Sequence, residues 1–179
     1  MSIPKTPDPG KVFLSILCSR FEDIWPELEQ LLTAELGSMD YQTQPFSFNE
    51  TAYYDQELGT PILRRIAAFE TLKPLDSLVD LKLFTNRLEN SFAAGGCRLF
   101  NLDPGLLTLE RLVLASGKNF THRVYMGKGI WADLTLIFTR GDWQDLAWTF
   151  PDYASEKMKK HLRAIRSRYL HQLRSQTKG

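Results

Sequence analysis

One short segment near the start of the chain, Lys11–Cys18 (KVFLSILC), most constrains how this protein can fold. It has the length of a β-strand and is apolar at most positions, whereas a strand with one face in water alternates polar and apolar residues. The segment therefore predicts a central strand that is covered on both faces.

A helix is expected directly after this strand. Ser19 and Glu22 fit a capping box at its start, but Pro26 would then lie inside the helix and remove a backbone hydrogen bond. A start nearer Ile24, with Pro26 in the first turn, is the alternative. Gly37 suits the position just past the helix end. The apolar residues of this segment follow helical spacing: Phe21, Ile24, Leu28, Leu31 and Leu32.

The next elements complete a β-α-β-β-α-β order. Tyr41–Phe48 predicts a second strand, which we expect at a sheet edge because Pro45 interrupts it. Ile62–Glu70 predicts a third strand, Leu75–Ala94 a second helix and Cys97–Leu102 a fourth strand. This order predicts an α+β fold with a ferredoxin-like, or split βαβ, core.

The rest of the chain predicts additions to this core. Asp103-Pro104-Gly105 has the composition of a sharp turn, since Pro fixes φ and Gly allows positive φ. A short helix or turn is expected at Thr108–Ala115, followed by a β-hairpin of His122–Met126 and Ile130–Thr139. A further strand is expected at Trp143–Thr149.

The register of the hairpin decides the surroundings of His122. A two-residue turn at Gly127-Lys128 would place His122 opposite Asp133, where the two could form an acid–base dyad. A three-residue turn, with Gly129 in the left-handed region, would instead place Arg123 opposite Asp133. We favour the second register, which makes His122 a histidine at the edge of the core, because it gathers the apolar residues on one face: Val124, Met126, Ile130, Ala132, Leu134, Leu136 and Phe138.

A basic amphipathic helix is expected from Ser155 to Gln172. From Glu156 to the end of the chain there are eight Lys or Arg and one acid, so the remaining chain is net acidic at an overall charge of +1. The cations are Lys157, Lys159, Lys160, Arg163, Arg166 and Arg168, and the apolar face is Met158, Leu162, Ile165 and Tyr169. The helix could dock on an acidic body, or its basic face could contact nucleic acid phosphates.

Length and composition predict one soluble domain. With 179 residues, of which 43% are hydrophobic, the chain can bury a single core. We expect residues 1–10, which are polar and rich in Pro, to be a loose lead-in, and residues 11–179 to be the domain. The chain lacks an apolar stretch of membrane-spanning length and a hydrophobic signal segment, which predicts a cytoplasmic protein without a membrane partner. Cys18 and Cys97 are then expected to be reduced, buried thiols.

Candidate site residues gather in one part of the sequence: Asn101, Asp103, Lys118, His122, Arg123, Lys128 and Asp133. If the fourth strand and the hairpin lie side by side, Asp103, His122 and Arg123 meet at one edge of the sheet. Such a mixed-charge group could bind an anionic or phosphorylated ligand. The alternative is an ion pair between Asp103 and Arg123 that only fixes the corner.

Known motifs do not assign a reaction. The sequence has no Cys or His set with zinc spacing, no G-x-x-x-x-G-K-[ST] phosphate loop and no Ser-His-Asp or nucleophilic-Cys signature. Cofactor, catalytic residues and oligomeric state therefore stay unassigned, and no metal site is expected. We favour a small-molecule enzyme or binding protein, with a nucleic-acid-binding module and a structural or partner-interaction protein as alternatives.

Four segments carry a family resemblance: DLKLFTNRLE, NLDPGLLTLERLVLASGKN, THRVYMGKGIWADLTL and LAWTFPDY. They resemble an uncharacterised bacterial group, domain-of-unknown-function family 4416. The resemblance covers nearly the whole chain, and its most specific parts are Asn101–Gly105, His122–Arg123 and Trp148–Tyr153. It implies no activity, cofactor or catalytic residue.

Overall fold

The computed structural model describes residues 1–176, which form a mixed α+β fold around one large antiparallel sheet. The nine strands are β1 (Gly10–Cys18), β2 (Met39–Gln42), β3 (Phe46–Ser47), β4 (Leu63–Lys73), β5 (Phe100–Leu107), β6 (Arg111–Ser116), β7 (Arg123–Gly127), β8 (Ile130–Thr139) and β9 (Asp142–Asp145). The five α-helices in this part of the chain are α1 (Phe21–Leu36), α2 (Asp55–Leu58), α3 (Leu78–Ser91), α4 (Pro151–Ala154) and α5 (Glu156–Gln176), and a short 3₁₀-helix, η1 (Leu75–Ser77), precedes α3.

The sheet is built outward from β1, as the first segment predicts. The strand order is β2-β4-β1-β5-β6-β8-β7, with β3 on β4 and β9 on β8. All nine residues of β1 are buried between the antiparallel neighbours β4 and β5. Val12, Leu14 and Ile16 pack in the core under α1 and α3, whereas Phe13 packs in the core under α5. The prediction of a central strand covered on both faces is confirmed.

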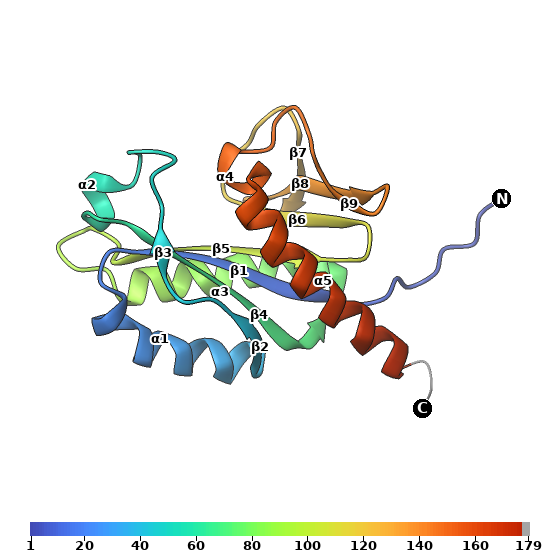
Figure 1. The fold of residues 1–179 in the computed structure, drawn as a ribbon, viewed down its shortest axis with the longest axis horizontal. Coiled ribbons are helices and arrows are strands. Elements are labelled where there is room, and N and C mark those ends of the chain that lie inside the picture. Colours follow the sequence, from blue (N-terminus) through green and yellow to red (C-terminus); the bar gives the residue numbers. More distant parts are fainter. Residues whose placement is uncertain (177–179) are drawn as a thin grey trace.

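Helices cover both faces of the sheet (Figure 1). Apolar residues of α1 and α3 share one core with the sheet, and α5 crosses the other face. The predicted apolar face of the last helix is confirmed, because Met158, Leu162, Ile165 and Tyr169 are all buried. Residues 1–9 form neither helix nor strand and extend away from this body.

The start of α1 differs from both predicted starts. The helix begins at Phe21, so Pro26 lies inside it, and the capping box is not formed. The Ser19 hydroxyl instead donates to the main-chain carbonyl of Leu58, because the end of α2 packs against Leu17 near the end of β1. The expected second strand is split at Pro45 into β2 and β3, and both pair with the outer edge of β4, which confirms the edge position.

The predicted turn at Asp103-Pro104-Gly105 is wrong, because these residues lie inside β5. The backbone N–H and C=O of Leu102 point away from β1, and the nitrogen of Pro104, two residues further on, points the same way. Pairing with β6 begins only at Gly105, so no strand partner lies where the missing N–H of Pro104 would point. Proline is therefore tolerated there, as it is on an edge strand.

Gly105 has a packing role and not a turn role. A Cβ added at this residue would lie 2.7 Å from the carbonyl oxygen of Val113, so β6 can approach β5 only because residue 105 has no side chain. The expected helix or turn at Thr108–Ala115 is only partly confirmed. Residues 108–110 form the turn between β5 and β6, where the Thr108 N–H donates to the Arg111 carbonyl at 2.9 Å, but residues 111–115 lie in strand β6, which pairs with β8.

β6 lies between β5 and the hairpin, so the condition that the fourth strand and the hairpin lie side by side is not met. Of the further strand expected at Trp143–Thr149, only the first residues are in a strand, β9, which ends at Asp145. Pro151 is the first residue of α4. Cys18 is buried as expected, but Cys97 is exposed, because it lies in a loop before β5 rather than in the strand.

The favoured register of the hairpin is confirmed, because Arg123 lies opposite Asp133. The turn itself is shorter than predicted: Gly127 pairs with Ile130, and Lys128 and Gly129 both have positive φ, at 51° and 77°. A register shift between Tyr125 and Gly127 restores the alignment. Since β7 is the last strand of the sheet, its side chains Val124 and Met126 are exposed rather than buried with β8.

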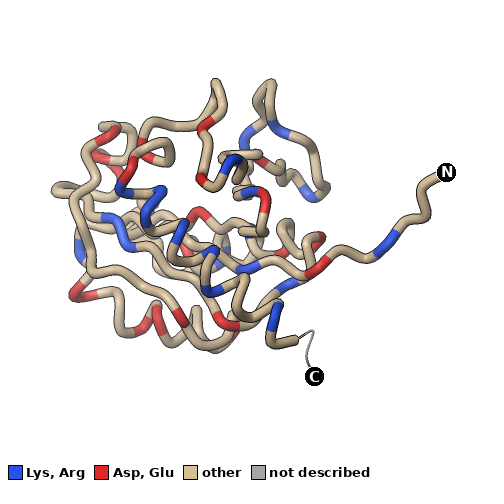
Figure 2. The backbone as a smooth tube through the Cα atoms, turned by 45° about the vertical axis from the view of Figure 1, so that its right-hand side comes forward, with Lys and Arg blue, Asp and Glu red and all other residues tan. Residues whose placement is uncertain are grey.

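Charge is unevenly distributed over the two helical layers. α1 carries Glu22, Asp23, Glu27, Glu29 and Glu35 and no Lys or Arg, and these acidic positions mark the lower edge of Figure 2.

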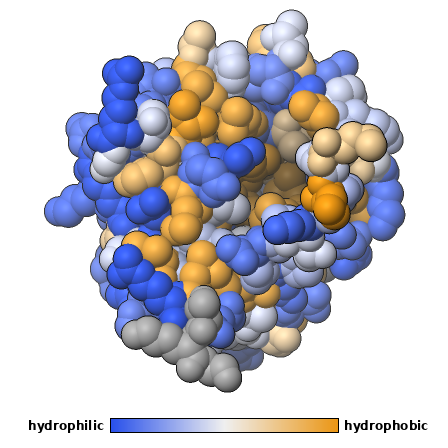
Figure 3. Space-filling model, turned by 90° about the vertical axis from the view of Figure 1, so that its right-hand side faces the viewer, coloured by the Kyte–Doolittle hydropathy of each residue, from blue (hydrophilic) through white to orange (hydrophobic). Residues whose placement is uncertain are grey.

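The face with the N-terminal residues and the end of α5 is mixed in hydropathy, because small apolar groups there are separated by hydrophilic ones (Figure 3). Within residues 1–176, the helices all fall short of the length and apolarity needed to cross a membrane.

Candidate ligand-binding cavity

A cavity forms where β5 and β6 separate. The two strands pair only over residues 105–107, so the first half of β5 has a free edge on that side. Side chains from α3 fill this edge: Lys82 Nζ donates to the Leu102 carbonyl at 2.8 Å, and Glu89 Oε1 accepts from the Leu102 N–H at 2.6 Å. The space beyond has a volume of about 650 Å³, which is within the range of small-molecule sites.

Charged residues from both halves of the chain line this cavity. Its five cations are Arg64, Lys82, Arg98, Lys118 and Arg123. Its five acids are Glu50, Glu89, Asp103, Asp133 and Asp152. The strands set the floor, because Arg64, Leu17 and Asn101 are Cα partners across β4, β1 and β5, and all three line the cavity. α4, residues 48–54 and the loop after β6 supply the walls.

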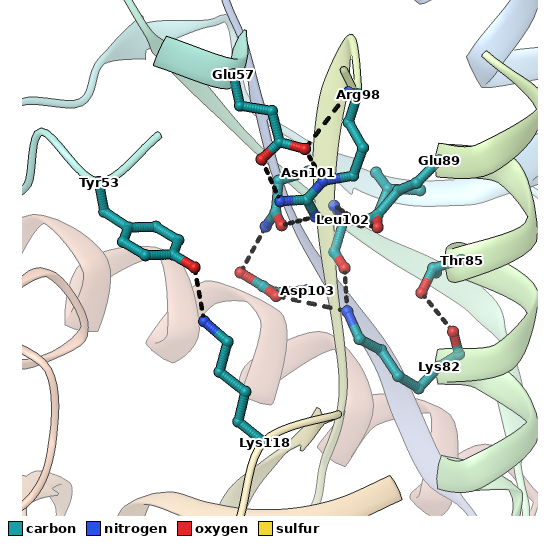
Figure 4. Close-up of polar contacts among 10 residues, drawn as sticks. All are labelled: Tyr53, Glu57, Lys82, Thr85, Glu89, Arg98, Asn101, Leu102, Asp103 and Lys118. Atoms are coloured by element: carbon teal, nitrogen blue, oxygen red, sulfur yellow. Dashed lines mark hydrogen bonds and ion pairs between the residues drawn. The ribbon is translucent and has the colours of Figure 1, made fainter. Parts of the chain in front are cut away.

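Arg98 holds one side of the cavity together (Figure 4). Its Nε and Nη2 donate to the two carboxylate oxygens of Glu57 at 2.6 and 2.7 Å, and its Nη1 donates to Glu89 Oε2 at 3.2 Å. Such a bidentate pair fixes both side chains in one geometry. Hydrogen bonds from Arg98 lower the pKa of Glu57, whereas burial raises the pKa of Glu89 despite its neighbouring cations.

The same network orients Asp103. Arg98 Nη1 also donates to the amide oxygen of Asn101 at 2.8 Å, which turns the Asn101 amide nitrogen toward Asp103 Oδ2 at 2.9 Å. Lys82 Nζ lies 3.7 Å from Asp103 Oδ1. The Asp103 side chain remains 33% exposed, so its carboxylate still faces the cavity.

Two further ion pairs neutralise cavity cations. Arg64 Nη2 lies 2.5 Å from Asp152 Oδ2, and Arg123 Nε lies 2.8 Å from Asp133 Oδ2. The alternative ion pair between Asp103 and Arg123 is therefore wrong. Asp103 lies beside Lys82, and Arg123 pairs with Asp133.

Lys118 differs from the other cavity cations. Its Nζ donates to the Tyr53 hydroxyl at 3.0 Å and lies 4.6 Å from the centre of the Tyr53 ring, and no carboxylate among residues 1–176 forms an ion pair with it. Both residues line the cavity and are exposed. The hydrogen bond from Lys118 lowers the pKa of Tyr53.

The structure brings five of the seven candidate residues to this cavity: Asn101, Asp103, Lys118, Arg123 and Asp133. His122 is not among the residues that line the cavity, but it contacts one of them, Asp133. Its Nε2 is 3.3 Å from Asp133 Oδ2, and its ring stacks on Trp148 at 5.2 Å between centres. A His–Asp contact therefore forms even in the favoured register, because His122 precedes β7 and is not held to the alternation of the strand. Lys128 lies apart, on the hairpin turn, where it pairs with Asp80 at 3.0 Å.

One family of proteins matches this chain over residues 8–169, and its description is a domain of unknown function, DUF4416. The chain belongs to this DUF4416 family. No curated protein and no solved structure matched it. The match leaves the activity of the DUF4416 chain to be argued from its cavity.

Sequence reasoning missed several cavity residues of this DUF4416 chain. Lys82, Asn86 and Glu89 recur at helical spacing on one face of α3, a polar stripe that could have been noticed. Arg64 is a second missed signal, because a buried arginine in a strand needs a partner. Arg98 lies in a loop, and nothing in the local sequence indicates that it would meet Glu57.

Two further observations concern possible metal ligands and the basic helix α5. Residues 1–176 contain no cluster of three or more His, Cys, Asp or Glu that could hold a metal ion. Several cations of α5 are engaged within the protein: Lys159 with Asp145 at 2.8 Å, Arg163 with Asp142 at 2.6 Å, and Arg166 with the carbonyl of Leu109 at 2.8 Å.

Proposed function

We propose that the cavity between β5 and β6 binds a small molecule that carries an anionic group. The observation that carries this proposal is Lys118. The other four cations of the cavity each have a carboxylate within 4 Å, whereas Lys118 contacts a tyrosine hydroxyl. An anion at Lys118 would therefore meet a positive charge that the described protein residues leave uncompensated.

The remaining ion pairs support the same proposal by holding the cavity open. The pairs Arg98–Glu57 and Arg64–Asp152 tie residues that come from distant parts of the chain. Side chains fixed in this way lose little further freedom when a ligand binds, and such preorganisation favours affinity.

A screen of anionic metabolites by thermal unfolding tests this function. The wild type should be stabilised by at least one carboxylate or phosphate compound, by about 2.7 kcal/mol at a hundredfold excess over Kd, which is about 5–10 °C for a chain of this size. Asn86→Trp should abolish the shift, because the indole would fill the space that Asn86 lines.

Asn90→Trp is the matched control. Asn90 lies one turn further along α3 and is exposed, so the same substitution there should leave the shift intact. A stabilising compound that acts equally on wild type and Asn86→Trp would bind elsewhere and would contradict the proposal.

The contacts that α5 makes with β9 and with Leu109 favour this ligand class over the nucleic-acid alternative. Cations that already contact Asp142, Asp145 and main-chain oxygen have less to gain from phosphates. A nucleic-acid interface would have to use the exposed remainder, such as Lys157 and Lys160.

We also infer that the core is ferredoxin-like. The order β2-β4-β1-β5 supports this class, since the four strands are antiparallel neighbours and both connecting helices, α1 and α3, pack on the same face. β6–β9 and α5 would then be additions, and the cavity would lie at the junction of core and addition.

A further inference from the structure

The chemistry around Asp103 limits what the other end of the ligand can be. This carboxylate faces the cavity from the floor of the sheet, and it is already bonded by Asn101 Nδ2 at 2.9 Å. Its second oxygen lies 3.7 Å from the ammonium of Lys82. Each carboxylate oxygen has more than one acceptor position, so Asp103 can accept further hydrogen bonds from a ligand.

Lys82 decides between two kinds of donor that a ligand could offer to Asp103. A ligand ammonium group beside Asp103 would be attracted to that carboxylate but repelled by Lys82. Lys82 is held in place by its hydrogen bond to the Leu102 carbonyl. A neutral hydroxyl meets no such repulsion. The site therefore suits hydroxyl donors better than amines.

Two tyrosines near Asp103 offer further hydroxyl chemistry. The Tyr153 hydroxyl is buried, and it makes no hydrogen bond of normal geometry within the part of the chain that the structure describes. Burial raises the pKa of both Tyr54 and Tyr153, so each stays a neutral phenol that can donate and accept. Both residues line the cavity.

The two ends of the cavity thus have different chemistry. Lys118 is an exposed residue of the lining whose positive charge is not paired with a carboxylate of the described residues, and Asp103 is a hydrogen-bond acceptor on the floor (Figure 4). Tyr53 and Phe48 contribute ring surface to the same lining. A ligand that fits both ends carries an anionic group on one side and hydroxyls on the other.

We propose that the ligand is a hydroxylated anion of the sugar-phosphate or sugar-acid class, with its anionic group at Lys118 and its hydroxyls on Asp103. This inference rests on the proposed function of the cavity and adds the class of the ligand. Phosphate and carboxylate satisfy Lys118 by the same charge, so the experiment separates them.

Four hexoses test the assignment by calorimetric titration of the full chain: glucose 6-phosphate, glucuronate, glucose and glucosamine 6-phosphate. Glucose 6-phosphate or glucuronate should bind, and the stronger of the two identifies the anionic group. Glucose should bind at least tenfold more weakly, because it lacks the charge. Glucosamine 6-phosphate should also bind at least tenfold more weakly than glucose 6-phosphate, because its ammonium would meet Lys82.

Asp103→Asn supplies a second readout. It should weaken binding of the preferred hexose at least tenfold but leave the affinity for inorganic phosphate equal or stronger, since the cavity becomes more positive. Equal binding of glucosamine 6-phosphate and glucose 6-phosphate would overturn the assignment, as would the failure of all four sugars to bind. If a non-hydroxylated anion binds and Asn86→Trp blocks it, the proposed function stands and this inference fails. If no anion binds in the cavity, both fail.

Discussion

Lys82 Nζ lies 3.7 Å from Asp103 Oδ1 and at the same time donates to the main-chain carbonyl of Leu102 at 2.8 Å. One side chain of α3 thus bonds a main-chain carbonyl at the free edge of β5 and also places a positive charge beside Asp103. The stability of the sheet and the chemistry of the cavity therefore depend on the same residue.

Lys82→Met should lower the free energy of unfolding by about 1–3 kcal/mol, because it leaves a buried carbonyl without its donor. Lys160→Met is the control, since Lys160 is exposed on α5 and its replacement should change stability by less than about 0.5 kcal/mol. Urea unfolding of the three proteins measures this, and equal midpoints for Lys82→Met and wild type would contradict the role of Lys82.

Gly105, within β5, and Gly117, directly after β6, should respond differently to an added methyl group. Gly105→Ala should destabilise the protein by about 1–3 kcal/mol, because its Cβ would lie 2.7 Å from the Val113 carbonyl. Gly117→Ala should be nearly neutral, because nothing lies within 4 Å of a Cβ there. Chemical unfolding compares the two variants, and a neutral Gly105→Ala would mean that β5 and β6 need not approach so closely.

The two glutamates that share Arg98 should have pKa values on opposite sides of 4.5, the usual value for this side chain. The pKa of Glu57 lies below this value because of its hydrogen bonds from Arg98, and the pKa of Glu89 lies above it because of burial. Stability from Glu57 is thus present above pH 4.5 and is lost as the pH falls through its lower folded pKa. Ionisation of Glu89 has the reverse sign and costs stability as the pH rises through its higher folded pKa.

Carboxyl-carbon NMR titration of the folded protein measures both values, with Glu57→Gln and Glu89→Gln used to assign the signals. Glu89→Gln should also gain stability relative to wild type as the pH rises above 4.5. A pKa of Glu89 below 4.5 would show that its cations outweigh burial and would reverse the second expectation.

Local periodicity was enough to predict the parts of the fold that depend on one segment at a time. Lys11–Cys18 is apolar on both faces and lies at the centre, and Met158, Leu162, Ile165 and Tyr169 are buried at their helical spacing. The pairing of Arg123 with Asp133 was also predicted correctly, but the single apolar face used to choose that register is not formed. Ile130 and Ala132 pack in the core under α1 and α3, Leu136 and Phe138 pack in the core under α5, and Val124 and Met126 are exposed.

The cavity could not be predicted in this way, because it depends on where two strands separate. Pro104 and Gly105 are turn residues by composition, but the divergence of β6 leaves the Pro104 nitrogen unopposed, and the approach of Val113 requires Gly105. Asp103 and Lys118 were grouped for the wrong reason. They line one cavity because β6 leaves β5 early, and not because β5 and the hairpin are adjacent.

The central claim is that Lys118 binds an anion in this cavity, and isothermal titration of the tighter-binding of glucose 6-phosphate and glucuronate tests it most directly. Wild type and Lys128→Gln should bind at one site with the same Kd, because Lys128 lies on the exposed hairpin turn with Asp80. Lys118→Gln should weaken binding at least tenfold, and Lys118→Arg should restore part of the affinity. Saturable binding with the same Kd in Lys118→Gln and wild type would contradict the account.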